Sequence, residues 1–263
     1  MSHQFARRGV SLVAILAFAA GADLCSAQAP ERPSPPPIPP VVLGPTLPTH
    51  PVRRTASGFV NQNSGKTIFN ERWVDASLLP RDKQGIWVLD FAFKPVRLVT
   101  VDVPGKGRRQ LHYMYYQVIN KTGKPRMFVP QFTIVTDNGK RFEDTVNPQG
   151  VKLIQAREDP SIPLLGAVEV VGMIPASEKQ GVDDAVFGVA VWENVDPTAD
   201  RFSVYVRGLS DGYQVVPPPE GSTDKPTSKF KTLRIDFIRR GDQFDLKERE
   251  IQLLDPAHEW IYW

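Results

Sequence analysis

Residues 110–140, QLHYMYYQVINKTGKPRMFVPQFTIVTDNGK, consist of two apolar segments, each followed by a polar turn. Residues 110–120 carry aromatic and aliphatic side chains on both faces, which is typical of a strand at the centre of a sheet. Residues 126–136 form a second strand, in which Pro130 marks a bulge or an edge because proline cannot donate to the ladder. The Asn-Gly pair at 138–139 is the one that type I′ hairpins prefer. This stretch therefore predicts an antiparallel β fold.

The rest of the chain repeats short strands between turn residues, and residues 148–159 are the one plausible helix. Strands with a turn signal about every 8–12 residues and almost no helix are typical of a β-sandwich. The C-terminal segment reads as a hairpin and a closing strand, which would lack a core of its own and should dock on the body. We expect further strands over residues 86–93, 96–103, 167–174, 185–193, 201–208, 213–216, 232–240, 244–254 and 260–262.

Composition divides the chain into five parts. Arg7, Arg8 and an apolar run over residues 10–20 are typical of a secretory signal peptide. Residues 30–51 hold ten prolines, a composition that favours extended polyproline II over helix or sheet. We predict a signal peptide at 1–27, a Pro-rich linker at 28–54, the β-sandwich at 55–216, a second linker at 217–228 and a C-terminal β segment at 229–263.

Cys25 is the only cysteine of the sequence. A cysteine near the end of a signal peptide can be lipidated, but Leu24 stands where a lipidation motif has a small residue. We therefore expect cleavage after Ala27, which leaves a mature chain without cysteine and excludes disulfides, thiolate metal sites and cysteine nucleophiles. The predicted location is periplasmic or extracellular, with lipid anchoring at Cys25 as the alternative and no membrane-spanning segment in the mature chain.

A set of turn residues follows the two strands of residues 110–140. A strand ending in V-x-N-x-T-G is followed by a second strand and T-D-x-G-x-x-F, at Val118, Asn120, Thr122, Gly123, Thr136, Asp137, Gly139 and Phe142. Over about residues 85–216 the chain resembles immunoglobulin-like β-sandwich modules of uncharacterised bacterial secreted and lipoprotein families. The resemblance implies a non-catalytic role outside the cytoplasm and carries over no site residues. The predicted fold is thus an all-β, immunoglobulin-like antiparallel sandwich with one short helix and an appended C-terminal β-hairpin.

Residues 208–212, GLSDG, spell the G-x-S-x-G of a hydrolase nucleophile elbow. Such an elbow needs a helix after the serine, whose amides help to form the oxyanion hole. Here the strand at 213–216 and then Pro217 follow, and neither can begin that helix. We therefore interpret Ser210 as a turn residue in the last hairpin of the sandwich, we predict no catalytic residue, and a serine hydrolase stays as the alternative that this motif raises.

The charged residues give no metal, cofactor or nucleic-acid site. The chain has 32 Lys and Arg against 29 Asp and Glu, and no dense basic run that would follow a phosphate backbone. Glu193, Asp196 and Asp200 share a loop, but their spacing does not match a calcium-binding loop. No histidine pair has chelating spacing. We predict no metal, no cofactor and no nucleic-acid partner.

The aromatic residues are the strongest indication of a binding surface. Trp260, Tyr262 and Trp263 lie at the C-terminal end of the sequence, and exposed tryptophans and tyrosines can stack on sugar rings or anchor a protein. The alternative is that these rings close the edge of the sandwich, with Trp87 and Trp192 in the core. We predict a non-catalytic binding or scaffolding module whose partner is an envelope protein or a polysaccharide, with a carbohydrate-binding module as the second hypothesis.

Overall fold

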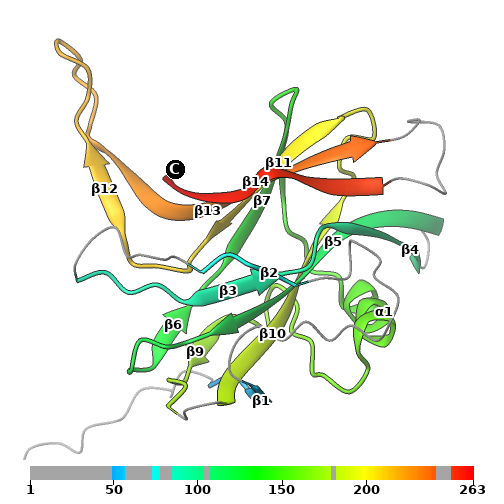
Figure 1. Cartoon of the computed structure of the whole chain (residues 1–263). Helices are drawn as coiled ribbons and strands as arrows, with labels where there is room; N and C mark the ends of the chain where they lie inside the picture. The colour runs from blue at the N-terminus through cyan, green and yellow to red at the C-terminus, as the bar shows by residue number, and fades with distance from the viewer. Residues whose placement is uncertain (1–48, 57–72, 78–84, 104–106, 179–181, 241–249) are drawn as a thin grey trace, which may run out of the picture. The chain divides into compact units, whose positions relative to one another are not determined.

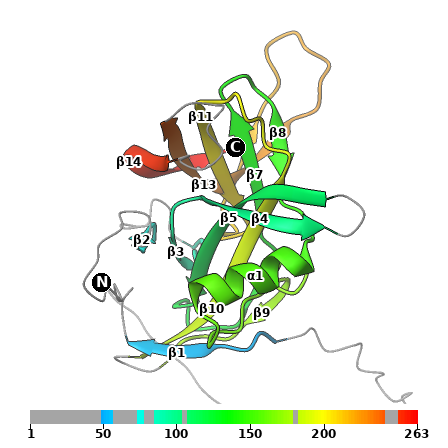
Figure 2. The ribbon, with the colours of Figure 1, turned by 90° about the vertical axis from the view of Figure 1, so that its right-hand side faces the viewer.

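The computed structural model describes residues 49–56, 73–77, 85–103, 107–178, 182–240 and 250–263, which form a β-sandwich with one short helix (Figures 1 and 2). The predicted signal peptide, Cys25 and most of the predicted Pro-rich linker lie outside these residues. In the first sheet the order is β1 (Arg53–Ala56), β10 (Val182–Glu193), β5 (Gly107–Ile119), β3 (Asp90–Phe93) and β2 (Val74–Asp75), and β4 (Arg97–Val103) also pairs with β5.

In the second sheet the order is β12 (Tyr213–Val216), β13 (Thr227–Arg240), β11 (Arg201–Arg207), β7 (Gln131–Thr136) and β8 (Arg141–Glu143), and β14 (Glu250–Tyr262) also pairs with β13. A small third sheet pairs β6 (Arg126–Phe128) with β9 (Gly172–Ile174). All strand pairs are antiparallel, which confirms the predicted fold class of an all-β sandwich. No helix among the described residues is long and apolar enough to cross a membrane.

Strand β5 occupies the centre of the first sheet, as its two apolar faces predict. Residues 111–119 are all buried. Met114, Tyr116 and Val118 face the second sheet and belong to the main core. The alternate side chains, Leu111 and Tyr113 among them, pack in a second cluster on the other face of the same sheet. A strand with this pattern can be buried only where both faces of its sheet are covered.

Helix α1 (Pro148–Glu158) provides that second cover, across β4 and β10 (Figure 2). Its start is fixed by Asn147, whose side-chain oxygen accepts a hydrogen bond from the amide of Gly150 at 2.8 Å, and by proline at the first helical position. Ile154 is fully buried against the apolar side chains of the first sheet. The predicted helix over residues 148–159 is confirmed.

The far end of α1 is held by a buried carboxylate. Glu158, whose side chain is 3% exposed, accepts hydrogen bonds from Lys94 at 2.9 Å, Arg97 at 3.0 Å and Tyr113 at 2.8 Å. Burial raises the pKa of Tyr113 far above its usual range, which keeps the phenol protonated as a donor to this carboxylate. Since each partner comes from β4, β5 or the segment between β3 and β4, this cluster fastens the helix to the sheet.

Pro130 divides the predicted strand over residues 126–136 into two. Strand β6 pairs with β9, whereas β7 pairs with β8 and β11 in the second sheet. The missing amide of Pro130 therefore marks the point at which the chain changes sheets. This is a larger effect than the bulge or edge that the sequence predicts.

The β7–β8 hairpin forms as predicted, but its turn is not type I′. That turn needs positive φ at two residues, and of residues 137–140 only Gly139 has it, with φ of +80°. The amide of Gly139 donates to the carbonyl of Thr136 at 2.8 Å, and the amide of Thr136 donates to the carbonyl of Lys140 at 3.0 Å. The Asn-Gly pair therefore forms a longer loop that ends in a left-handed glycine.

The C-terminal residues are part of the second sheet. Strands β13 and β14 form the predicted hairpin, but β13 lies within the sheet because it also pairs with β11 and β12. The sequence predicts separate strands at 244–254 and 260–262; residues 244–249 lie outside the described residues, and β14 joins residues 250–254 to residues 260–262 as one strand. Its register against β13 shifts between Ile235 and Phe237. Residues 217–228, predicted as a linker, connect β12 to β13 as the loop of a hairpin and include the first residues of β13.

We predict that a side chain at Gly188 destabilises the sandwich. Gly188 lies directly opposite Tyr116, and a Cβ at this position would overlap the phenol ring. Gly188→Ala should lower the free energy of unfolding by about 1–3 kcal/mol, and Gly188→Val by more, because a packed core cannot accept added volume. Chemical denaturation measures the change.

A double-mutant cycle tests the cause. Tyr116→Leu removes the ring, so Gly188→Ala should cost clearly less in that background than in the natural chain. An equal cost in both backgrounds would show that the ring is not the obstacle.

Candidate functional site

Ser210 joins the two sheets. Its hydroxyl donates to the carbonyl of Trp87 at 2.8 Å and accepts from the amide of Gly212 at 3.0 Å. The neighbouring Asp211 carboxylate accepts from the amide of Trp87 at 2.9 Å. No described histidine is hydrogen-bonded to Ser210. The polar side chains of residues 208–212 thus hold residue 87, which precedes β3, against the segment between β11 and β12.

The prediction of a hairpin at residues 208–212 is wrong. Strand β11 pairs with the C-terminal part of β13 and β12 with its N-terminal part, and between them the amide of Lys231 donates to the carbonyl of Gly212 at 2.8 Å. Strands β11 and β12 therefore lie end to end along one edge of β13. Gly208 makes the break: its φ is +94°, and a side chain there would overlap the backbone carbonyl of Val129.

The acidic side chains of residues 193–200 do not converge on a common point. Glu193 accepts a hydrogen bond from Asn147 at 2.8 Å. Asp196 accepts from Asn138 at 2.8 Å and from the ammonium group of Lys140 at 2.6 Å. Within the described ranges no three His, Cys, Asp or Glu side chains gather as metal ligands.

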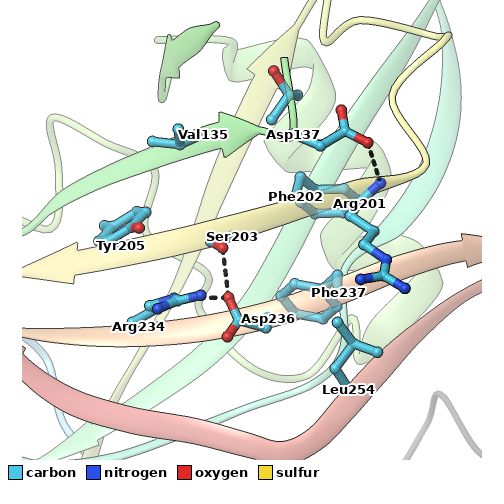
Figure 3. Close-up of a pocket in the computed structure, with 11 residues that line it drawn as sticks. Val135, Asp137, Arg201, Phe202, Ser203, Tyr205, Arg234, Asp236, Phe237 and Leu254 are labelled. Carbon is cyan, nitrogen blue, oxygen red and sulfur yellow. Dashed lines mark hydrogen bonds and ion pairs between the residues drawn. The ribbon is translucent and has the colours of Figure 1, made fainter. Parts of the chain in front are cut away.

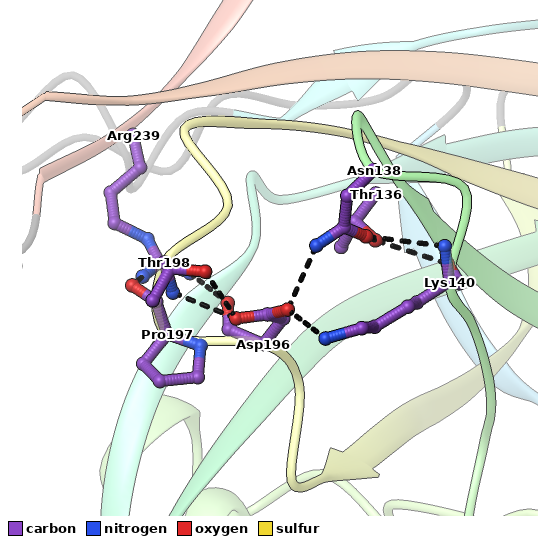
Figure 4. Close-up of polar contacts among 7 residues, drawn as sticks. All are labelled: Thr136, Asn138, Lys140, Asp196, Pro197, Thr198 and Arg239. Atoms are coloured by element: carbon purple, nitrogen blue, oxygen red, sulfur yellow. Dashed lines mark hydrogen bonds and ion pairs between the residues drawn. The ribbon is translucent and has the colours of Figure 1, made fainter.

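Asp196 is instead the centre of a polar cluster (Figure 4). The cluster joins the loop between β7 and β8, the loop after β10 and strand β13. Its second carboxylate oxygen accepts from the amide and the hydroxyl of Thr198 at 2.9 and 2.7 Å, which closes a local turn. The guanidinium of Arg239, buried on β13, donates to the carbonyls of Pro197 and Asp196. The hydrogen bond from Lys140, followed by those from Thr198 and Asn138, holds the pKa of Asp196 well below its usual range.

The predicted trio of aromatic residues does not form one surface. The indole of Trp260 donates to the carbonyl of Ala76 at 3.0 Å and packs against the main core. Tyr262 points the same way as Trp260, since residues two apart share a face of a strand, and its ring lies 5.3 Å from the ammonium group of Lys231. Only Trp263 lies on the outer face, where it stacks on Tyr205 with ring centroids 4.3 Å apart.

The other tryptophans are committed to packing. Trp192 is fully buried, and Trp73 packs against Tyr115 and Phe187 on the first sheet. Trp87 is partly buried against the main core. The exposed row of rings that would form a flat sugar-binding platform is therefore absent from the described residues.

The two sheets differ in how they are covered. Helix α1 and residues 159–165 cover the outer face of the first sheet. None of the described elements packs on the outer face of the second sheet, which we call the open face. From the pairing and alternation of its strands, the open face carries Arg141, Glu143, Ser203, Tyr205, Arg207, Phe230, Arg234, Asp236, Glu259 and Trp263.

A pocket of about 300 Å³ lies on the open face across β7, β11 and β13 (Figure 3). Asp236 accepts hydrogen bonds from the hydroxyl of Ser203 and from Arg234, the latter at 2.9 Å. Asp137 accepts from the backbone amide of Arg201 at 3.2 Å, and no described carboxylate pairs with the guanidinium of Arg201. Hydroxyl, carboxylate and guanidinium groups thus surround a pocket that also includes the ring of Tyr205, a combination that suits a polar ligand.

Arginine side chains lie over two rings of the open face. The guanidinium carbon of Arg207 lies 3.6 Å from the ring centroid of Phe230, and that of Arg141 lies 5.0 Å from the ring of Trp263. Beyond them, the hairpin of β12 and β13 extends away from the sandwich (Figure 1). Tyr213 and Val215 on this hairpin are 61% and 53% exposed, and Phe230 is 37% exposed. Large apolar side chains that are exposed side by side mark a contact surface.

Compared with protein-family models, with curated proteins and with solved structures, the chain matches none.

Of the residues on the open face, only Trp263 is among the predicted site residues. The alternation of residues 201–207 places Ser203, Tyr205 and Arg207 on one side of a strand, and this signal was available. Their nearness to Trp263 was not available, because it depends on β13 lying between β11 and β14.

We predict that Asp196→Asn lowers the melting temperature by several degrees at pH 7, because a neutral amide replaces the carboxylate that accepts a charged hydrogen bond from Lys140. A depressed carboxyl pKa stabilises the fold above the unfolded value of about 4 and loses that effect as the pH falls through the folded value. The melting temperatures of the two proteins should therefore begin to converge as the pH falls below about 4.

Asp102→Asn is the matched control, since Asp102 is 83% exposed and its ion pair with Arg108 spans 3.9 Å. This control should leave the melting temperature unchanged. A difference between Asp196→Asn and the natural chain that stays constant from pH 3 to pH 7 would contradict the role of the charge.

Proposed function

We propose that the chain is an exported, non-catalytic binding module and that the open face of the second sheet is its binding surface. The observation that carries the proposal is the difference between the two sheets: helix α1 covers one outer face, whereas the other bears stacked rings, arginines and a polar pocket. A sheet face that is left open with aromatic side chains on it is a common basis for recognition.

Export is the part of the proposal that the sequence supports. The basic and apolar pattern of residues 1–27 suits a signal peptide, and the ten prolines of residues 30–51 suit a semi-rigid spacer. We also retain the immunoglobulin-like module as part of the proposal, on the turn residues at Asn120, Gly123 and Gly139. The partner would then be a protein or a polysaccharide of the cell envelope.

A polysaccharide is the second, narrower candidate, and the pair of Tyr205 and Trp263 beside the pocket favours it. Aromatic rings next to carboxylate, hydroxyl and guanidinium groups can bind the apolar faces and the hydroxyls of a sugar at the same time. This surface differs from the predicted one, because Trp260 and Tyr262 point inward and Tyr205 and Asp236 take their place.

Binding of the purified chain to an isolated envelope fraction tests the proposal. Tyr205→Ala combined with Trp263→Ala should weaken binding at least tenfold, since hot-spot aromatic residues contribute about 2 kcal/mol or more each. Co-sedimentation over a range of protein concentrations measures the affinity, and a melting curve of each variant checks that it is folded.

Leu153→Ala is the control, because Leu153 is 41% exposed on α1, on the covered side of the sandwich. This variant should bind as the natural chain does. If the open-face variant and the control bind equally well, the open face is not the binding surface.

A further inference from the structure

We propose that the ligand of the open face is a polysaccharide that carries oxyanion groups, and that Arg141 and Arg207 bind these groups. The inference rests on the proposed function and adds the chemical class of the ligand. It starts from the two arginines that lie over the rings of Trp263 and Phe230.

The position over a ring prepares both guanidinium groups for an oxyanion. A guanidinium that lies over a ring keeps its N–H groups in its own plane, where they can form paired hydrogen bonds with a carboxylate, sulfate or phosphate. Contact with the ring also removes part of the hydration shell and restricts the side chain before the ligand arrives. Neither Arg141 nor Arg207 forms an ion pair with another described residue.

The carboxylates of the open face are already engaged. Glu143 accepts from the hydroxyl of Thr133 at 2.7 Å, and Asp236 and Glu259 accept from Arg234 at 2.9 and 3.0 Å. Arg234 is therefore paired with two carboxylates, whereas Arg141 and Arg207 form no ion pair with a described residue. The guanidinium groups of Arg141 and Arg207 can thus pair with an anion that comes from outside the chain.

The two arginines are neighbours on the face. Phe230 of β13 and Trp263, the residue after β14, exchange both backbone hydrogen bonds, each at 3.0 Å, so they lie directly opposite each other. The Cβ atoms of such a pair are about 5 Å apart, which brings the two stacked guanidinium groups to one region of the sheet. A ligand can then contact both with adjacent charged groups.

The surface continues on both sides of the arginines along one line of strands. Towards the start of β11 lies the pocket of Ser203 and Asp236, and towards β12 lie the exposed Tyr213 and Val215. A small anion would occupy only the central part of this line, whereas a linear polymer could contact all of it. The hydroxyl and carboxylate groups of the pocket match the hydroxyls of a sugar, which favours a polysaccharide over an acidic peptide.

The test uses polymers that differ only in charge. The full mature chain is titrated with polygalacturonate and its carboxyl-reduced form, and with dextran sulfate and dextran, at several salt concentrations. We expect at least tenfold tighter binding to one charged polymer than to its neutral counterpart. The charged polymer that binds distinguishes carboxylate from sulfate recognition.

Arg141→Gln combined with Arg207→Gln should abolish that preference and reduce the salt dependence. Arg207→Lys keeps the charge but loses the planar donors and should lie between the two. Arg108→Gln is the matched control, because Arg108 is 79% exposed on β5 in the first sheet, and it should bind as the natural chain does.

Equal binding of charged and neutral polymers, or an equal loss in the Arg108→Gln control, would overturn the inference. So would binding of poly-glutamate or single-stranded DNA as tightly as the acidic polysaccharides. If Tyr205 and Trp263 are still needed for envelope binding in that case, the proposed function stands without an anionic ligand. If neither the aromatic nor the arginine variants change envelope binding, both proposals fail.

Discussion

The structure depends on the need to cover both faces of strand β5. Leu111 and Tyr113 point to one side of the strand, Met114 and Tyr116 to the other, and all four are buried. Apolar area of this size is stable only when it is removed from water on both sides. The chain meets this need with two different covers, the second sheet on one side and helix α1 on the other. The strands of the second sheet are apolar on their inner face only, and none of the described elements covers their outer face.

Three backbone features allow one chain to build these layers. Pro130 ends the pairing of β6 and sends the chain into the second sheet, and Gly208 turns the chain away from β13 before β12 resumes the pairing. The Lys94-Pro95 step divides β3 from β4 along β5 in the same way. At each point a proline or a left-handed glycine interrupts a ladder where an ordinary residue would continue it. The long strands β5 and β13 remain continuous and act as the axis of each sheet.

Local patterns were sufficient to predict the fold class, the helix and the central position of β5, because the alternation of apolar residues, turn residues and two-sided apolarity are properties of short segments. The same patterns could not predict how segments pair. The hairpin expected at residues 208–212 depended on β11 and β12 being partners, and β13 takes that position for both. The inward direction of Trp260 and Tyr262 likewise follows from their register with β13, where Leu233 and Lys231 face the same side.

The candidate site also depends on how the strands pair. Arg141 comes from the β7–β8 hairpin, Tyr205 and Arg207 from β11, Phe230 from β13 and Trp263 from the end of β14. Each of these side chains lies on the polar side of its own strand, where an isolated aromatic or arginine carries no signal. They become a surface only because β13 joins β11 to β14 across its two edges. A C-terminal hairpin that docked as a separate unit would bury or scatter these side chains, so the integration of β13 into the sheet is what brings the proposed binding face together.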